Sequence, residues 1–236
     1  MLKDLNLEYV LFLDIETVPA VARFTDLTKK YRALWEKKAE QMKRNNPEKT
    51  ADELYPRAGI YAEFGKVVCI SCGFVKGKTF RLKSFFGDDE HEVLQQFSEL
   101  LSGYYNTDSH LLCAHNGKEF DFPYLSRRML VNGLKIPEIL NLAGKKPWEV
   151  RHLDTMELWK FGDYKHYTSL DLLTTIFDIP TPKEDMDGSM VWKVYWEEND
   201  LERIARYCQE DVIATAQILR RYMGLPLFGE KEIILR

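Results

Sequence analysis

Glu8-Tyr9-Val10-Leu11-Phe12-Leu13-Asp14-Ile15-Glu16-Thr17 is the stretch from which the fold of this chain can be read. Residues 8–13 form an apolar run of strand length, and residues two apart in a strand share a face. Asp14 and Glu16 are therefore predicted to project together from the end of this strand. Two adjacent carboxylates repel each other unless a cation lies between them. The stretch thus indicates a metal site at a strand end.

A second acidic side chain follows another short strand. Leu111-Leu112-Cys113-Ala114 is apolar, and the chain then turns at Asn116-Gly117 into a predicted helix that carries Asp121. Asp121 would lie in the first turn of that helix.

The third segment is a predicted helix over residues 200–223, which closes at Gly224, a residue type favoured just past a helix end. Its buried stripe is predicted to contain Leu201, Ile204, Ala205, Cys208, Val212, Ala216 and Leu219. At the helical spacing of four residues, Tyr207 and Asp211 fall side by side on one flank of this stripe.

At these residues the chain resembles the DEDD superfamily of 3′-to-5′ exonucleases, which has a ribonuclease H-like fold. The spacing Tyr207-x-x-x-Asp211 is similar to the tyrosine subclass, whereas the histidine subclass would need a histidine at position 206, where Arg206 stands. The likeness spans about residues 8–222 and is nearest to the predicted exonucleases related to the proofreading domain of family B DNA polymerases. It implies an α/β fold with a mixed central sheet flanked by helices.

The resemblance also implies roles for the five residues. Asp14, Glu16 and Asp211 would hold the first of two divalent cations, Mg²⁺ or Mn²⁺. Asp14 would bridge to the second cation, with Asp121 in that cation's coordination sphere. Tyr207 would orient the attacking water. Taken singly, the same side chains could be a solvated strand end, a first-turn helix acid and an exposed i,i+4 pair.

Three further residues are candidates for substrate contact: Thr17, Asn116 and Phe120. Asn116 belongs to the second motif and is implied to touch the backbone of the substrate strand. Phe120 fits core packing better than chemistry. Asp154 resembles a position common in the superfamily and is interpreted as a helix cap that supports the site.

The whole chain of 236 residues, 45% of them hydrophobic, is predicted to be a single domain, 1–236. Residues 18–65 are expected to form a helical insertion, and residues 225–236 a C-terminal tail. Further strands are expected at 66–75 and 79–86, and further helices at 89–104, 119–131, 155–161 and 168–178. Cys69 and Cys72 lie three apart in a strand, so they face opposite sides and fit core positions rather than zinc ligands.

The chain has a net charge of −4, which is unexpected for a protein that binds the negatively charged phosphates of nucleic acid. The net charge does not oppose binding if cations neutralise the carboxylates of the site and basic patches around it contact the phosphates. The first candidate patch comprises Lys29, Lys30, Arg32, Lys37, Lys38, Lys43 and Arg44, on a helix expected to bury Phe24, Leu27, Tyr31, Leu34 and Met42. The second comprises Lys145, Lys146, Arg151, His152, Lys160, Lys165 and His166. For both sets the alternative is an ordinary solvated charged surface.

Function follows from these expectations. The chain is predicted to remove nucleotides from single-stranded or frayed 3′ ends of DNA, releasing nucleoside 5′-monophosphates. An exoribonuclease of the same fold and an inactive nucleic-acid-binding module are the alternatives. With no apolar run of 18 residues and no secretory pattern, a cytoplasmic protein without membrane contact is expected.

The tail carries one more candidate interaction. Gly224-Leu225-Pro226-Leu227-Phe228 resembles the short Leu-x-Leu-Phe peptides that dock on bacterial sliding clamps, although it lacks their usual first glutamine. The alternative is that Leu225, Leu227 and Phe228 fold back onto the core and that residues 230–236 form a terminal strand.

Overall fold

A six-stranded mixed sheet forms the centre of the computed structural model, which describes residues 2–42, 47–163, 167–180 and 186–235. Its strands are β1 (Val10–Pro19), β2 (Gly65–Lys76), β3 (Thr79–Phe86), β4 (Leu111–Ala114), β5 (Leu153–Asp154) and β6 (Ile233–Leu235). The strand order is β5-β4-β1-β2-β3-β6. β1, β2 and β3 pair antiparallel, whereas β4, β5 and β6 join by parallel pairing. The expected α/β fold with a mixed sheet is confirmed.

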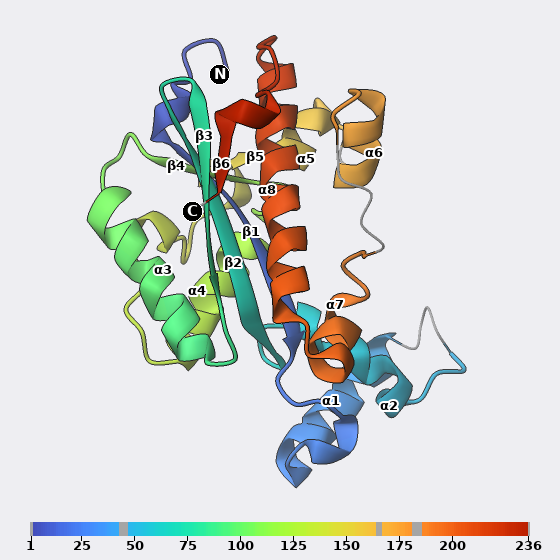
Figure 1. The fold of residues 1–236 in the computed structure, drawn as a ribbon. Coiled ribbons are helices and arrows are strands. Elements are labelled where there is room, and N and C mark those ends of the chain that lie inside the picture. Colours follow the sequence, from blue (N-terminus) through green and yellow to red (C-terminus); the bar gives the residue numbers. More distant parts are fainter. Residues whose placement is uncertain (1, 43–46, 164–166, 181–185, 236) are drawn as a thin grey trace.

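Helices cover both faces of this sheet (Figure 1). They are α1 (Lys29–Met42), α2 (Ala51–Leu54), α3 (Glu90–Tyr104), α4 (Asp121–Val131), α5 (Thr155–Lys160), α6 (Leu170–Ile176), α7 (Val191–Lys193) and α8 (Leu201–Tyr222). Figure 1 shows α3 and α4 on one side of the sheet and the long α8 on the other. A π-helical turn, η6 (Val194–Glu198), leads from α7 into α8.

The alternation of β1 sends its side chains to two separate cores. Leu11, Leu13 and Ile15 pack with α3 and α4. Val10 and Phe12 pack beneath α8, and Val18 belongs to a third cluster that also contains residues of α8. Because side chains two apart share a face, the even-numbered positions of β1 all point toward α8.

The first strand is longer than the sequence indicated. Asp14 and Glu16 lie inside β1, opposite Ser71 and Cys69 of β2, and not at the end of the strand. The register shifts between Glu16 and Thr17, which marks a β-bulge directly after the acidic pair. The long antiparallel partner β2 keeps β1 extended to Pro19, so the first two residues of the expected insertion belong to the sheet.

The helical segment after β1 has a small core of its own. This core consists of Leu27, Trp35, Ala39, Leu54, Tyr55 and Ala58. Trp35 is fully buried and donates its indole N–H to the Ala51 carbonyl at 2.7 Å. The expectation that Tyr31 and Leu34 pack inward is wrong, because they are 49% and 44% exposed. Trp35 and Ala39, four residues apart, form the buried face of α1 instead.

The end of the chain returns to the sheet. Phe228 is buried and stacks on Phe80 of β3, with ring centroids 5.4 Å apart. The side chain of Gln217 in α8 hydrogen-bonds both the N–H and the carbonyl of Phe228 at 2.9 Å. The strand β6 then pairs parallel with β3. The tail is therefore packed, and docking on a sliding clamp, which stays a prediction, would require Phe228 to leave this site.

No helix in the described part of the chain combines the length and the apolar character needed to span a membrane.

Candidate active site

Asp14 and Glu16 occupy even positions of β1 and therefore point toward α8. One oxygen of each and the Sγ of Cys208 lie within 4.8 Å of one another, a spacing that could hold a metal ion. The Cys208 thiol donates to the Asp14 carboxylate at 3.3 Å. Sequence reasoning placed Cys208 in the buried stripe of α8 and missed this contact, because helical periodicity does not show what a buried residue faces.

Tyr207 and Asp211 meet on the flank of α8 as expected, one turn apart, and the two side chains are hydrogen-bonded. Burial raises the pKa of Asp211 to about 6, although the bond from Tyr207 opposes this rise. Burial and the negative charge of Asp211 also raise the pKa of Tyr207, so its hydroxyl keeps its proton. A Cβ built on Gly188 would lie 4.0 Å from that hydroxyl, so the loop before α7 borders it.

Asp121 is the first residue of α4 and is only 3% exposed. Its Oδ1 atom is buried without any hydrogen-bond partner. Burial raises the pKa of Asp121 to about 8, while backbone hydrogen bonds from Asp121 itself and from Ile15 oppose the rise. A buried carboxylate oxygen without a partner is costly in a folded protein unless another group occupies that position.

The four carboxylates act on one another electrostatically. Burial is the largest cause that raises the pKa of Asp14, followed by the charges of Glu16, Asp211 and Asp121. Burial also raises the pKa of Glu16, followed by the charges of Asp211, Cys69 and Asp121. Within the described residues, no ion pair engages any of the four.

This donor set fits a hard divalent cation. Mg²⁺ and Mn²⁺ prefer carboxylate oxygens, and a bound cation lowers the energy of neighbouring negative charges. The unpartnered Oδ1 of Asp121 and the raised pKa values of all four acids identify negative charges that a cation would stabilise.

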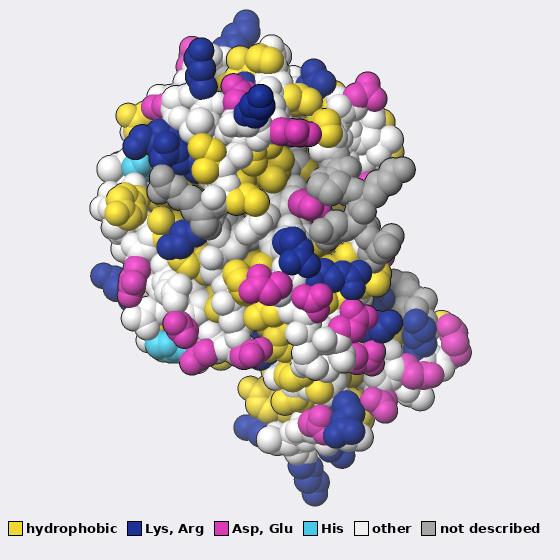
Figure 2. Space-filling model, viewed as in Figure 1, with side chains coloured by type: hydrophobic (Ala, Val, Ile, Leu, Met, Phe, Trp, Pro, Cys, Tyr) yellow, Lys and Arg dark blue, Asp and Glu magenta, His cyan; other side chains and the backbone are white. Residues whose placement is uncertain are grey.

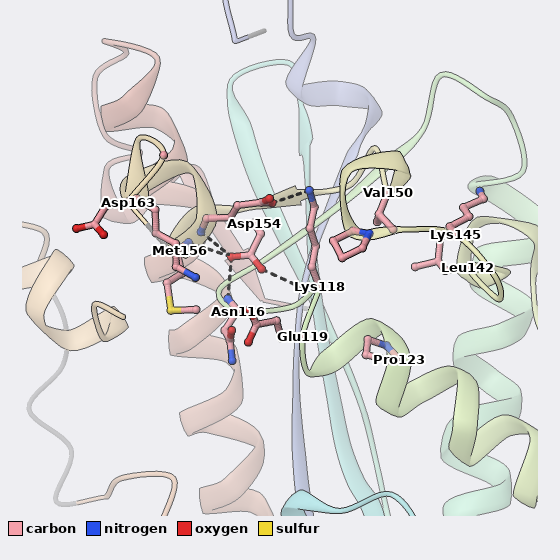
Figure 3. Close-up of a pocket in the computed structure, with 14 residues that line it drawn as sticks. Asn116, Lys118, Glu119, Pro123, Leu142, Lys145, Val150, Asp154, Met156 and Asp163 are labelled. Atoms are coloured by element: carbon pink, nitrogen blue, oxygen red, sulfur yellow. Dashed lines mark hydrogen bonds and ion pairs between the residues drawn. The ribbon is translucent and has the colours of Figure 1, made fainter. Parts of the chain in front are cut away.

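The loop before Asp121 is shaped by Asp154, which is 3% exposed (Figure 3). The Asp154 carboxylate accepts from the backbone N–H groups of Asn116 and Lys118, and from those of Met156 and Glu157 at the start of α5. Asp154 is thus the helix cap that the sequence indicated, and it also holds the second motif. Asn116 adopts a left-handed backbone with φ of 64°, a conformation that asparagine tolerates better than most residues.

The other two candidates for substrate contact lie close to this loop and to the acidic pair. Thr17 follows the bulge in β1 and is half-buried, and its side chain hydrogen-bonds Tyr124. Phe120 precedes α4 and packs its ring against Tyr124 at 5.3 Å, partly buried at the edge of the core. The packing role expected for Phe120 is therefore seen, whereas its contact with a substrate stays a prediction.

The second candidate basic patch loses one of its members in the structure. His152 does not belong to a surface patch, because it is 7% exposed and burial lowers its pKa to about 4. Lys43, Arg44, Lys165 and His166 lie outside the described residues. On the face shown in Figure 2, Lys and Arg side chains are interspersed with acidic ones.

Cysteine placement agrees with the sequence interpretation. All four cysteines are free and buried. Cys72 packs in the core under α3 and α4, whereas Cys69 packs with α8, so the two face opposite sides of β2.

Comparison with known proteins places these features in a family. The family described as "Predicted 3′-5′ exonuclease related to the exonuclease domain of PolB" matches residues 60–226. That range contains Asp121, Tyr207 and Asp211 and begins after Asp14 and Glu16.

Similar proteins include DNA polymerases of archaea. The chain is 24% identical over 149 residues to a DNA polymerase of Pyrococcus glycovorans. The aligned region covers 58% of this chain and 18% of that protein. The chain is 26% identical over the same length to a DNA polymerase of Desulfurococcus sp. (strain Tok), with the same shares. The chain thus spans less than a fifth of these relatives.

A solved structure agrees on the fold. The family B DNA polymerase of the hyperthermophilic archaeon Pyrobaculum calidifontis superposes with a TM-score of 0.53 at 17% identity, over 91% of this chain and 24% of that one.

Proposed function

Because the chain belongs to the family of predicted 3′-5′ exonucleases related to the exonuclease domain of PolB, we propose that it hydrolyses terminal phosphodiester bonds at the 3′ ends of single-stranded DNA. The products are nucleoside 5′-monophosphates. Two observations carry the proposal. The buried Asp14 and Glu16 are close enough to Asp121 and Asp211 to feel their charges, and the Oδ1 atom of Asp121 is buried without a partner.

In this proposal Asp14, Glu16, Asp121 and Asp211 hold two divalent cations, Mg²⁺ or Mn²⁺. When bound, such ions activate a water and stabilise the leaving oxygen of a phosphodiester. The Cys208 thiol fixes the Asp14 carboxylate by donating to it, so that Asp14 keeps one orientation.

The remaining residues position the reactants. The Tyr207 hydroxyl keeps its proton, and it turns from Asp211 toward the attacking water, which it orients by a hydrogen bond. Thr17 and Asn116 contact the strand at the two sides of the acidic cluster, one after the bulge of β1 and the other in the loop before α4. Phe120 supports Asp121 by packing on Tyr124.

The first prediction tests the reaction and the site together. Strands labelled at the 3′ or the 5′ end, as single-stranded DNA, RNA and duplex DNA, are digested with and without Mn²⁺. We expect stepwise shortening from the 3′ end of single-stranded DNA, dependent on the cation. Asp14→Ala and Asp211→Asn should abolish it while leaving the circular dichroism spectrum unchanged, because these side chains contribute charge rather than packing.

Asp52→Asn, at an exposed carboxylate of α2, is the matched control and should keep full activity. Faster shortening of RNA than of DNA would replace the proposed substrate by RNA. Full activity in either site variant would show that the site is elsewhere.

A further inference from the structure

A pocket of about 610 Å³ lies beside the candidate active site, between the loop that precedes α4 and the start of α5 (Figure 3). Asn116 and Glu119 line it, and Asp121 follows two residues after Glu119. The pocket is therefore lined in part by the loop that leads to Asp121 at the start of α4. Its volume is in the range of sites that enclose small organic groups.

The pocket is lined by apolar residues together with nearly equal numbers of positive and negative side chains. The apolar part consists of Pro123, Leu142, Pro147, Val150 and Met156. Three lysines and four carboxylates also line it, but Asp154 is held by four backbone N–H groups and Glu157 pairs with Lys118 at 2.6 Å. Attraction to phosphates is thus a small part of what this surface offers, and flat apolar groups fit it better.

Two strongly exposed aromatic rings flank the pocket in the sequence. Trp148, between the lining residues Pro147 and Val150, is 76% exposed. Phe161, between the lining residues Lys160 and Gly162, is 89% exposed. Each ring is adjacent in the chain to residues that line the pocket, and exposed rings beside a pocket are candidates for ligand contact.

The backbone of Phe161 is strained as well. Its φ is 44°, in the left-handed region that a bulky side chain rarely adopts. This conformation ends α5 and leaves the ring exposed, with an edge contact to Trp159 at a centroid distance of 6.5 Å. Core packing therefore does not account for a phenylalanine at a position that favours glycine.

Lysines accompany the rings. The Nζ of Lys146 lies 5.2 Å from the Trp148 ring centroid, and that of Lys160 lies 4.2 Å from the ring of Tyr167, which is 65% exposed. Exposed rings with nearby cations are the combination by which proteins hold single-stranded nucleic acid, since bases stack on the rings and the cations follow the backbone.

We propose that Trp148 and Phe161 stack unpaired bases of the single-stranded DNA substrate beside this pocket, and that stacking, more than phosphate contact, holds the strand. The inference rests on the proposed function for the direction of the strand toward Asp121. It explains why a duplex end, whose bases are stacked on each other, would be a poorer ligand.

The test measures binding without hydrolysis. The dissociation constant of a fluorescent single-stranded DNA of about 12 nucleotides, within the span such proteins cover, is determined by anisotropy in EDTA. Trp148→Ala and Phe161→Ala should each weaken binding by about 5- to 150-fold. Trp148→Tyr and Phe161→Tyr keep a ring and should stay close to the unmodified protein. Tyr104→Ala is the matched control, because Tyr104 is 73% exposed on α3 and does not line the pocket.

A strand of the same length with abasic nucleotides separates stacking from backbone contact. The unmodified protein should bind it more weakly than the normal strand, and the two alanine variants should bind it as the unmodified protein does. Normal binding by both alanine variants, or an equal loss on the abasic strand, would overturn the inference. Stacking-dependent binding by a protein that shortens no 3′ end would instead defeat the proposed function and leave the inference standing.

Discussion

At the scale of single residues, the site is built from carboxylates whose ionised form is disfavoured by burial. Asp121 reaches it from the start of α4 and Asp211 from the middle of α8, and burial raises the pKa of both. Burial thus opposes the ionised form of each of the four carboxylates, and a neighbouring cation would favour it. The same burial that opposes the charge of these carboxylates strengthens their attraction for a divalent cation.

The second prediction concerns Tyr207→Phe. The change removes the hydroxyl that is hydrogen-bonded to Asp211 but keeps the ring that packs beside Cys208. We expect kcat for cation-dependent shortening of single-stranded DNA to fall by about 10²–10⁴-fold, the usual contribution of a positioned proton-handling group. Calorimetric Mn²⁺ binding should be retained. A variant with full kcat would reduce Tyr207 to a packing residue.

The third prediction concerns pH and the buried His152. Its Nε2 donates to the Ile139 carbonyl at 2.8 Å and its Nδ1 accepts from the Leu112 N–H at 3.2 Å, so the folded protein holds a neutral ring. Burial lowers its pKa from 6.5 to about 4. Between these values the unfolded chain takes up a proton that the folded protein does not. The free energy of unfolding should therefore fall by about 3 kcal/mol as the pH decreases from 6.5 to 4.

Urea denaturation at pH 7 and pH 4.5 measures this effect against His152→Gln, which keeps a donor but does not titrate. Acid also protonates the carboxylates of the site, with the opposite sign, in both proteins. The difference between the two proteins therefore isolates His152. An identical pH dependence would contradict the assignment of a neutral buried ring.

At the scale of elements, one side chain joins three pieces of the fold. Asp154 ends the edge strand β5, caps α5 and holds the backbone of the loop between β4 and α4. Because β4 pairs with both β1 and β5, this loop emerges next to Asp14 and Glu16. The position of Asn116 beside the acidic pair thus depends on hydrogen bonds made by the neighbouring strand.

The fourth prediction tests this dependence with Asp154→Ala. The change leaves four backbone N–H groups without their acceptor, so we expect a loss of roughly 2–4 kcal/mol in the free energy of unfolding. Because the Asn116 loop is then free to shift, kcat/KM should also fall by about 10–100-fold. Denaturation and exonuclease assays measure the two effects.

Asp89→Ala is the matched control. Asp89 caps α3 by accepting from the N–H groups of His91 and Glu92, on the far side of the sheet from α8. Its loss should cost about 1 kcal/mol without any change in kcat/KM. Equal effects of the two changes on activity would argue against a positioning role for Asp154.

At the scale of the whole molecule, local patterns predicted elements well and their packing less well. The apolar runs and helix signals predicted β2, β3, α3 and α8 to within one or two residues. They could not show that β1 continues through Asp14 and Glu16, because its extension depends on pairing with a strand about fifty residues later. The edge strand β5 has two residues and leaves no periodic signal.

The same division holds for the site. Spacing alone predicted that Tyr207 and Asp211 share a helix flank and that Asp14 and Glu16 share a strand face. The contact between Cys208 and Asp14 joins residues far apart in the chain and became visible only with the packing of α8 on the sheet. The contact between Asp154 and the Asn116 loop also became visible only in the structure. The sequence predicted that Asp154 caps a helix, but a capping pattern does not show which other loop the same side chain contacts.

The last prediction concerns the tail, where two opposing readings of the same residues lead to different measurements. Phe228 stacks on Phe80 and lies under the guanidinium of Arg220, 3.9 Å from its ring centroid. Removing its ring leaves a cavity in the core, so Phe228→Ala should cost about 3 kcal/mol and lower Tm by roughly 6–12 °C. Leu235→Ala, at a tail side chain that is 62% exposed, is the control and should change Tm by no more than about 1–2 °C.

If the tail instead works mainly as a clamp-docking peptide, Phe228 must leave this site to bind. The cost of that release would then reduce the affinity, because binding is weakened by the fraction of molecules in the packed state. A pull-down with a bacterial sliding clamp distinguishes the two cases. Capture of the unmodified protein together with an unchanged Tm for Phe228→Ala would favour docking, whereas a lowered Tm without capture assigns the tail to the fold, since a ring that holds β6 against β3 cannot serve as a free anchor.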